Sequence, residues 1–305
     1  MEILELKDTK TVPDTFYPYS EDSSIPIIID NGSYNCRVGW ITSQKPLLSF
    51  KNLIAKPRKE RGKKDGETQV GNDITNIEAV RFQLKTQFDR NVVTHFEVQE
   101  QIFDYIFSHL GIDTEGSIDH PVVMTEALLN PNYSRMLMSE LLFECYGVPG
   151  VSYGVDSLFS YHRHNHSKKF GLVLSFGYQT THVLPILDGK VDIKHARRID
   201  IGGFHITNYL HRLLQLKYPT HFAAITPSRA EELLHDHCFL AKHYIDELNK
   251  WSNGDHYDAH VRRIQLPYTA PILGLTAEQQ KERRRELAKR LIEINARKRE
   301  EKLAE

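Results

Sequence analysis

Short apolar runs that end at turn residues recur along the chain. Residues 27–29 are consecutive isoleucines, and they lead directly into Asp30, Asn31 and Gly32, a strong turn signal for a hairpin. Beyond this turn, apolar and polar residues alternate up to Trp40, as in a strand with one buried face. The pattern predicts a hairpin over residues 27–40, with Asp30, Asn31, Gly32 and Ser33 at its tip.

Strand and helix patterns then alternate through the first half. Strands are predicted at residues 46–55 and 121–125. Helices are predicted at 76–88, at 96–110, at 134–146 with Met138, Leu141, Leu142 and Cys145 inward, and, as a helix or turn, at 153–162. Strands that alternate with helices are typical of an α/β fold in which helices flank a mixed sheet.

The opening pattern returns in the second half. Residues 170–175 predict a buried strand, 176–179 a turn and 180–187 the return strand, and Asp188 and Gly189 predict a further bend. A strand then ends at Gly202 and Gly203, immediately before a predicted helix at 204–218, and another helix is predicted at 229–246. Two strand–turn–strand units ahead of helices indicate duplicated halves that grip a phosphate between them.

The composition is that of an ordinary globular protein. The chain has 305 residues, 40% hydrophobic and 26% charged, and a formal net charge of -1, which gives no electrostatic footprint for binding nucleic acid with the whole molecule. The three cysteines are far apart and lack a CxxC spacing, so we expect a reducing compartment and no metal site built on thiolates. No apolar stretch reaches the roughly 20 residues that a membrane span needs, and we expect an intracellular protein.

Two charged or polar clusters leave alternatives open. The basic run comprises Lys56, Arg58, Lys59, Arg61, Lys63 and Lys64. It is either a solvated loop or a contact with DNA, an acidic protein or the nuclear-import machinery. His162, His164 and His166 resemble metal ligands on one face of a strand, but we interpret them as a polar loop and predict no metal site.

The residues at the hairpin tip carry groups that can bind a ligand. Asp30 can accept hydrogen bonds or hold a hydrated cation, while the backbone N–H groups of Gly32 and Ser33 can bind a phosphate. Taken alone, an ordinary hairpin with Asn31 and Gly32 at its bend explains the same residues.

Four motifs, in order, resemble those of the actin superfamily over about residues 27–245. Asp30-Asn31-Gly32-Ser33 resembles the first phosphate-binding loop of actins, and residues 171–185 resemble the second. Thr125-Glu126-Ala127-Leu128-Leu129-Asn130-Pro131 begins a segment similar to the one that links them, and residues 198–210 resemble the glycine-containing junction that follows. The resemblance implies an actin-like (ribonuclease-H-like) α/β fold with duplicated mixed-sheet domains, the second half incomplete, plus a C-terminal charged helix.

The implied domains are an irregular N-terminal arm at 1–26 that lies across a surface and a first domain at 27–168 with a basic excursion at about 41–75. A partial second domain follows at 169–270, and a charged helix at 276–305. That helix has a thin apolar stripe of Leu287, Leu291 and Ile294. It is either a solvated, salt-bridged helix, a partner-binding coil or a DNA-facing helix. We expect a truncated isoform or a fragment.

The resemblance implies a nucleotide site that is vestigial or structural. Its residues are Asp30, Asn31, Gly32, Ser33, Arg37, Gly177, His182, Gly202 and Gly203. Ser175 stands where actins have an Asp at the start of the second loop, Phe176 and Tyr178 replace a small residue and a second Asp, and Asp156 replaces a glutamine that orients water. Phosphoryl transfer depends on positioning and on a metal, so we expect no catalysis. ATP as a structural ligand remains the alternative, although Cys238 and Phe239 lie near where actins present a Lys-Glu pair to the nucleotide.

Within the superfamily, residues 69–72, 88–91, 138–147 and 213–219, and the tail from residue 282, most resemble the actin-related subunits of the Ino-eighty type of nuclear chromatin remodeller. The family implies a noncatalytic nuclear protein, active in transcription regulation, DNA repair and recombination. Its implied partners are the motor subunit, a small Ies6-like subunit, RuvB-like ATPases, nucleosomal DNA and histones. Contact candidates are the basic run and Arg283, Arg284 and Arg285. An ATP-hydrolysing actin-like enzyme is the second hypothesis, and a filament former is the third.

Overall fold

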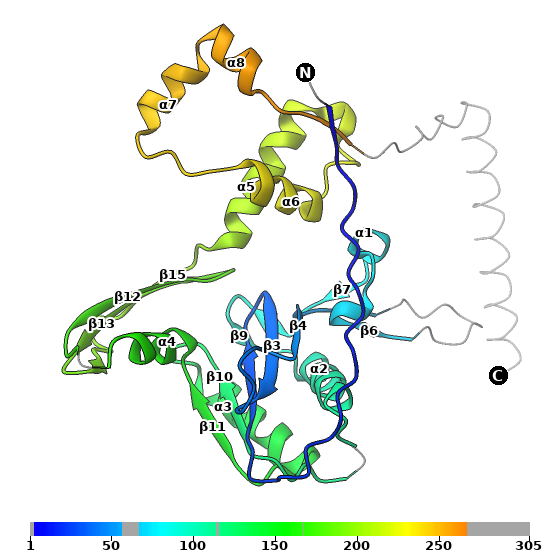
Figure 1. The fold of residues 1–305 in the computed structure, drawn as a ribbon, viewed down its shortest axis with the longest axis vertical. Helices are drawn as coiled ribbons and strands as arrows, with labels where there is room; N and C mark the ends of the chain where they lie inside the picture. The colour runs from blue at the N-terminus through cyan, green and yellow to red at the C-terminus, as the bar shows by residue number, and fades with distance from the viewer. Residues whose placement is uncertain (1–2, 57–66, 114–115, 167, 267–305) are drawn as a thin grey trace, which may run out of the picture. The chain divides into compact units, whose positions relative to one another are not determined.

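A computed structural model describes residues 3–56, 67–113, 116–166 and 168–266. The chain divides into two units, Met1–Leu6 with Arg262–Glu305, and Lys7–Val261. In the first unit, β1 (Ile3–Glu5) pairs in parallel with β16 (Arg263–Gln265), so the arm predicted as irregular contains one short strand. The second unit holds all other described elements (Figure 1).

The first half is built on a five-stranded mixed sheet with the order β11-β10-β2-β3-β4. The predicted hairpin is confirmed, with β2 (Ile27–Asn31) and β3 (Asn35–Trp40) antiparallel and Asp30 opposite Arg37. The predicted strands also form, as β4 (Leu48–Lys51) and β10 (Val122–Thr125). Parallel pairing of β10 with β2 and with β11 (Val151–Gly154) makes the sheet mixed, as the sequence predicted.

Helices α2 (Phe96–His109) and α3 (Asn132–Glu140) carry the apolar faces that complete this core. Ile102, Phe103, Ile106 and Phe107 of α2 are fully buried. Beyond α3, Leu141–Cys145 form a π-helical turn, η2. A π turn needs one more residue than an α turn, so Tyr146 is buried in place of Cys145, which is exposed, and the predicted inward position of Cys145 was wrong.

The described residues between β4 and α2 differ most from the prediction. The helix predicted at 76–88 is wrong beyond α1 (Ile77–Val80), because the chain then forms β7 (Leu84–Lys85), which pairs with β5 (Ile54–Ala55). β6 (Gln69–Val70) pairs with the other edge of β5, and η1 (Gly71–Asp73) follows it. β8 (Phe88–Asp89) and β9 (Val92–Val93) make a small hairpin. Pairing with a distant strand therefore overrode a local periodicity of four.

The second half is built on a four-stranded antiparallel sheet, in which β12 (Gly171–Phe176) pairs with β13 (Thr181–Leu187). β13 also pairs with β14 (Lys190–Val191) and β15 (Arg197–Ile199). The predicted bend is confirmed, with φ of 50° at Asp188 and 75° at Gly189. β12 was expected to be buried, yet every second side chain of this strand is exposed, because one face of the sheet is uncovered by the described residues.

Helices precede and follow the strands of the second sheet along the chain. α4 (Asp156–His164) contains His162 and His164 in its last turn, so the predicted polar loop begins only after it. α5 (Gly203–Lys217) forms as predicted, followed by η3 (Pro219–His221), and α6 (Pro227–His237) begins at the Thr226 cap. The helix predicted at 229–246 is wrong at 238–243, because the backbone becomes extended at Cys238 and ends α6 there. Leu240 in this break is 99% exposed. α7 (Tyr244–Trp251) and α8 (Gly254–His260) follow.

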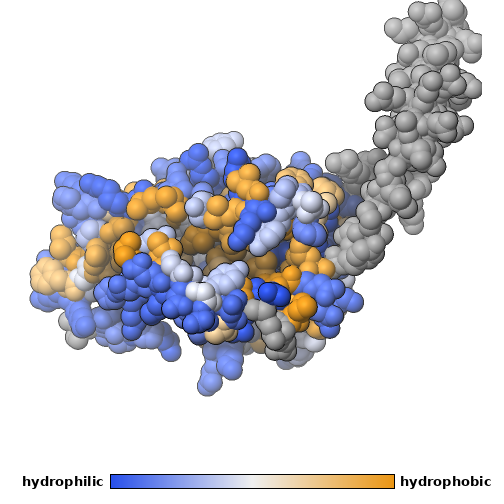
Figure 2. Space-filling view, turned by 90° about the horizontal axis from the view of Figure 1, so that it is seen from above, coloured by the Kyte–Doolittle hydropathy of each residue, from blue (hydrophilic) through white to orange (hydrophobic). Residues whose placement is uncertain are grey.

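Several predictions fall outside the described residues, namely most of the basic run at 57–66 and the charged helix at 276–305. Among the helices that the structure describes, none combines the length and the apolar character needed to cross a bilayer. Viewed from above, the molecule shows patches of hydrophobic side chains among hydrophilic ones (Figure 2).

Candidate functional site

The tips of the two hairpins face one cavity of about 270 Å³. The first hairpin, β2–β3, contributes Asp30, Asn31, Gly32, Ser33 and Arg37, and the second, β12–β13, contributes Ser175, Gly177, Tyr178 and His182. The structure therefore brings together most of the residues that the sequence assigned to a phosphate-binding site. The cavity also takes Asp156 from the start of α4 and Glu126 from the end of β10.

Asp30 is already held by two partners. Thr125 Oγ1 donates a hydrogen bond to Oδ1 at 2.9 Å, and Arg37 Nη1 lies 3.1 Å from Oδ2. The register of β2 and β3 places Arg37 directly opposite Asp30, which explains this ion pair. The guanidinium is thus committed to a protein carboxylate and offers less positive charge to a bound anion.

Asn31 belongs to the core more than to the cavity. Its Nδ2 donates to Gln99 Oε1 at 2.9 Å, and its Oδ1 accepts from Asn52 Nδ2 at 2.7 Å. Asn52 Nδ2 also lies 2.9 Å from Gly32 O, and Gln87 Nε2 donates to Asn52 Oδ1 at 2.7 Å. This chain of buried amides fixes the shape of the first loop from behind.

His182 lies on the buried face of β13, directly opposite Ser175 on β12. Burial, followed by the positive charge of Arg198, lowers the pKa of its imidazole, and the carboxylates of Asp156 and Asp200 only partly oppose this shift. The ring is therefore neutral near pH 7. With Ser175 in place of a carboxylate, the second loop presents no anionic side chain of its own to a metal ion.

Gly202 and Gly203 do not line the cavity. They support the second loop from behind, where Gly203 N donates to Gly177 O at 3.1 Å and Phe204 N donates to Tyr178 O at 2.8 Å. A Cβ atom on Gly202 would lie 2.5 Å from both of these carbonyl oxygens, so only glycine permits the junction of β15 and α5 to approach the loop this closely.

Two tyrosines outside the predicted set of nucleotide-binding residues join the loops, although Tyr178 was noted as the replacement of an Asp. The ring centroids of Tyr34 and Tyr178 are 4.8 Å apart, with an interplanar angle of 44°. The Tyr34 hydroxyl donates to Glu231 Oε1 on α6, and Lys51 Nζ lies 3.3 Å from Glu231 Oε2. Burial and the nearby Glu231 carboxylate raise the pKa of Tyr178 to about 12. The signal in the sequence was a bulky aromatic residue in each of two glycine-containing turns.

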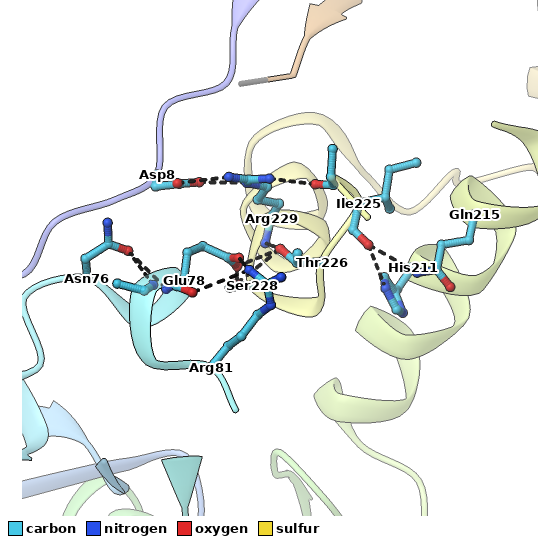
Figure 3. A network of polar contacts seen from close by, with 12 residues as sticks. Asp8, Asn76, Glu78, Arg81, His211, Gln215, Ile225, Thr226, Ser228 and Arg229 are labelled. Carbon is cyan, nitrogen blue, oxygen red and sulfur yellow. Dashed lines mark hydrogen bonds and ion pairs between the residues drawn. The ribbon is translucent and has the colours of Figure 1, made fainter. Parts of the chain in front are cut away.

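A second junction ties the N-terminal arm and α1 to α6 (Figure 3). Arg229 Nε and Nη2 lie 2.7 and 3.0 Å from the two carboxylate oxygens of Asp8. Glu78 Oε1 accepts hydrogen bonds from Thr226 Oγ1, at 2.6 Å, and from Ser228 Oγ. Thr226 also caps α6, since its hydroxyl accepts from Arg229 N. The arm was expected to lie across a surface, and Asp8 shows one place where it is anchored.

The residues around the cavity do not fit a magnesium nucleotide between the loops. The tyrosine rings are in contact where the loops approach each other. Of the described side chains that line the cavity, Arg37 is the one cation, whereas Asp30, Glu126 and Asp156 are carboxylates. Arg37 is already paired with Asp30, and Glu126 is paired with Arg135, so the described lining offers the phosphates no cation that is free of a carboxylate. In the described part of the chain, no three His, Cys, Asp or Glu side chains are grouped as metal ligands.

The basic contact candidates are described only at Lys56. Its backbone N–H donates to Gln83 O at 3.0 Å, and its side chain is partly exposed. Arg58, Lys59, Arg61, Lys63 and Lys64 lie outside the described residues, as do Arg283, Arg284 and Arg285.

Comparisons with known proteins give a consistent result. The family model for actin matches residues 21–236. Proteins called actin-related protein 5 are 53% identical to the chain in Drosophila melanogaster and 50% in Homo sapiens, each over 92% of this chain, and 48% in Gallus gallus, over 99% of it. The matches cover 46%, 47% and 51% of those proteins respectively, so the chain spans about half the length of the curated relatives it matches. The two loop motifs line one cavity, as the resemblance to actins implied, and these matches agree with it. The chain therefore belongs to the actin family, in its actin-related protein 5 branch.

Proposed function

We propose that the chain acts as a noncatalytic actin-related subunit of a nuclear ATP-dependent chromatin-remodelling complex. In this role it couples the motor subunit to nucleosomal DNA and histones, in transcription regulation and DNA repair. The relatives named above support the assignment to an actin-related protein. The remodelling role is our extension from the family-specific segments of the sequence.

One observation carries the noncatalytic part of the proposal. The second loop has Ser175 and Tyr178 where phosphoryl transfer in an actin-like site would use carboxylates, and the side chain of Tyr178 packs on Tyr34 of the first loop. Hydrolysis of a nucleotide depends on a positioned metal ion and water. A loop that presents a hydroxyl and an aromatic ring cannot supply the charge that positions the metal.

The proposed partners are the remodeller's motor subunit, a small Ies6-like subunit, RuvB-like ATPases, nucleosomal DNA and histones. Co-purification of the tagged chain from nuclear extract, with mass spectrometry of the bound proteins, tests this set. We expect remodeller subunits to be enriched over an untagged control. Their absence at matched expression would contradict the proposal, as would exclusion of the chain from nuclei.

Contact with DNA is proposed for the basic residues Lys56, Arg58, Lys59, Arg61, Lys63 and Lys64 and for Arg283, Arg284 and Arg285. Phosphate contacts release counterions, so each lost contact reduces the salt dependence of the affinity by about one unit of slope. Replacing Arg58, Lys59 and Arg61 with Glu should therefore weaken DNA binding by the complex and flatten its salt dependence. The matched control replaces Lys242, Lys250 and Arg262, which lie elsewhere in the chain.

A second candidate function is an actin-like protein that binds ATP and hydrolyses it weakly. The first loop favours it, because Asp30, Gly32 and Ser33 are retained and line the cavity. Phosphate release by the natural chain and by Ser175→Asp separates the two functions. We expect no turnover above the buffer rate from the natural chain, and sustained turnover by it would establish the second function instead.

A further inference from the structure

The contact between the two loops is made by side chains and involves more than one pair of rings. Tyr34 and Tyr178 have ring centroids 4.8 Å apart, and the ring of Phe204 on α5 makes a T-shaped contact with Tyr178, with the centroids 5.7 Å apart. At these separations the rings are in van der Waals contact. A phosphate group therefore cannot occupy the space that these rings fill.

The ring contact is anchored from α6. Glu231 accepts a hydrogen bond from the Tyr34 hydroxyl, and both of its carboxylate oxygens lie 3.3 Å from Lys51 Nζ. The Lys51 ammonium is also 5.2 Å from the centroid of the Tyr34 ring, within the range of a cation–π contact. The Glu231 side chain is only 14% exposed, so this carboxylate has its charge compensated by Lys51 and one lone pair satisfied by Tyr34.

The rings also separate two cavities. One is the 270 Å³ cavity described above. The other has a volume of about 330 Å³, and its lining includes Leu53, Leu84, Thr207 and Pro227. Ser33, Tyr34 and Tyr178 line both cavities. The side chains of the two tyrosines therefore lie on the boundary between the two cavities.

We propose that Tyr34, Tyr178 and Glu231 form an internal plug that holds the two loops together in place of a nucleotide. The two halves of the fold then close on each other without a ligand, and magnesium ATP has no site between the loops unless the rings separate. The plug accounts for a first loop that keeps Asp30, Gly32 and Ser33 without a nucleotide between the loops. It stands on its own geometry and does not depend on association with a remodeller.

Amide hydrogen exchange on the whole chain tests the plug, because exchange reports local opening of each loop. In the natural chain, we expect magnesium ATP to leave the exchange of residues 30–36 and 175–182 unchanged. Tyr178→Ala should raise exchange in both segments about three- to tenfold, the range expected for the loss of an aromatic pair. Tyr209→Ala is the matched control, since Tyr209 on α5 is 67% exposed.

Two milder variants keep the test decisive if Tyr178→Ala does not fold. Tyr34→Phe and Glu231→Gln both weaken the anchor and keep the size of each side chain. Each should raise exchange of the first loop, and the double variant should add little, because both changes act on one hydrogen bond. Protection of both loops by magnesium ATP in the natural chain would overturn the proposal. So would unchanged exchange in Tyr178→Ala, Tyr34→Phe and Glu231→Gln, and neither result bears on the co-purification experiment.

Discussion

Single buried side chains determine the shape of the first loop. Asn52 is 2% exposed and makes three side-chain hydrogen bonds, to Asn31, Gly32 and Gln87. Removing its amide leaves these buried groups without partners, and each such loss is costly. We expect Asn52→Ala to lower the free energy of unfolding by about 2–4 kcal/mol, as measured by urea denaturation.

Asn208→Ala is the control for this measurement. The Asn208 side chain lies on α5 and makes no side-chain hydrogen bond to any described residue, so its removal should change stability by less than about 0.5 kcal/mol. Equal effects of the two substitutions would show that the buried amides do not stabilise the loop.

His182 makes stability depend on pH. Burial and Arg198 lower the pKa of its imidazole from the ordinary value of 6.5. The unfolded chain then binds a proton that the folded chain excludes, so the contribution of this group is present above pH 6.5 and is lost as the pH falls below it. We expect His182→Gln to reduce the loss of stability between pH 7.5 and pH 5, as measured by urea denaturation at both values.

His164→Gln, an exposed change at the end of α4, should leave the loss as it is in the natural chain. An identical loss in His182→Gln would refute this role.

Among the contacts between elements, the ion pair of Asp8 and Arg229, which joins the N-terminal arm to α6, can be measured directly. The side chains of Arg229 and Asp8 are 11% and 23% exposed, and their two-point contact lowers the pKa of the Asp8 carboxyl, chiefly through the hydrogen bond from Arg229. A double-mutant cycle of Asp8→Ala and Arg229→Ala should give a coupling energy of about 1–2 kcal/mol.

The pair of Glu247 and Lys250 on α7 provides a comparison, because the Lys250 side chain is 60% exposed and the two residues are three apart on one helix. Its cycle should give less than about 0.5 kcal/mol. If the Asp8 cycle gives a value as small as this, the arm is not held on α6 by that ion pair. Limited proteolysis should then also cut residues 7–14 equally fast in the natural chain and in Arg229→Ala.

The elements that the sequence predicted correctly are those whose signal is local. The hairpin at β2–β3 has its turn residues beside its strands, and α2 buries apolar residues at helical spacing, among them Val98, Ile102 and Ile106. The helix predicted at 76–88 was wrong because Leu84 and Lys85 pair with β5, which lies far earlier in the chain. The same limit applies to the site: both loops were predicted, but the contact of Tyr34 with Tyr178 joins residues distant in sequence, and no spacing indicates it.

At the scale of the molecule, the two sheets differ in how they are covered. On the second sheet, Leu184 and Ile186 of β13 are buried, whereas Leu172, Leu174 and Phe176 on the opposite face of β12 are 60%, 50% and 77% exposed. β12 is also an edge strand, with one neighbour among the described residues. An exposed apolar face beside a free edge favours self-association.

We therefore expect this face to bind hydrophobic dyes and to promote concentration-dependent association of the chain. Leu172→Thr with Leu174→Thr keeps residues that favour strands and removes apolar surface from the exposed face. This double variant should lower dye fluorescence and the apparent mass in light scattering, with a change in unfolding free energy of less than about 1 kcal/mol.

Leu184→Thr is the matched change on the other face, where burial is complete, and it should lower the free energy of unfolding by about 2–5 kcal/mol. Because the two changes replace the same residue type in paired strands, opposite outcomes would assign the association to the exposed face. An unchanged apparent mass in the double variant would place it elsewhere.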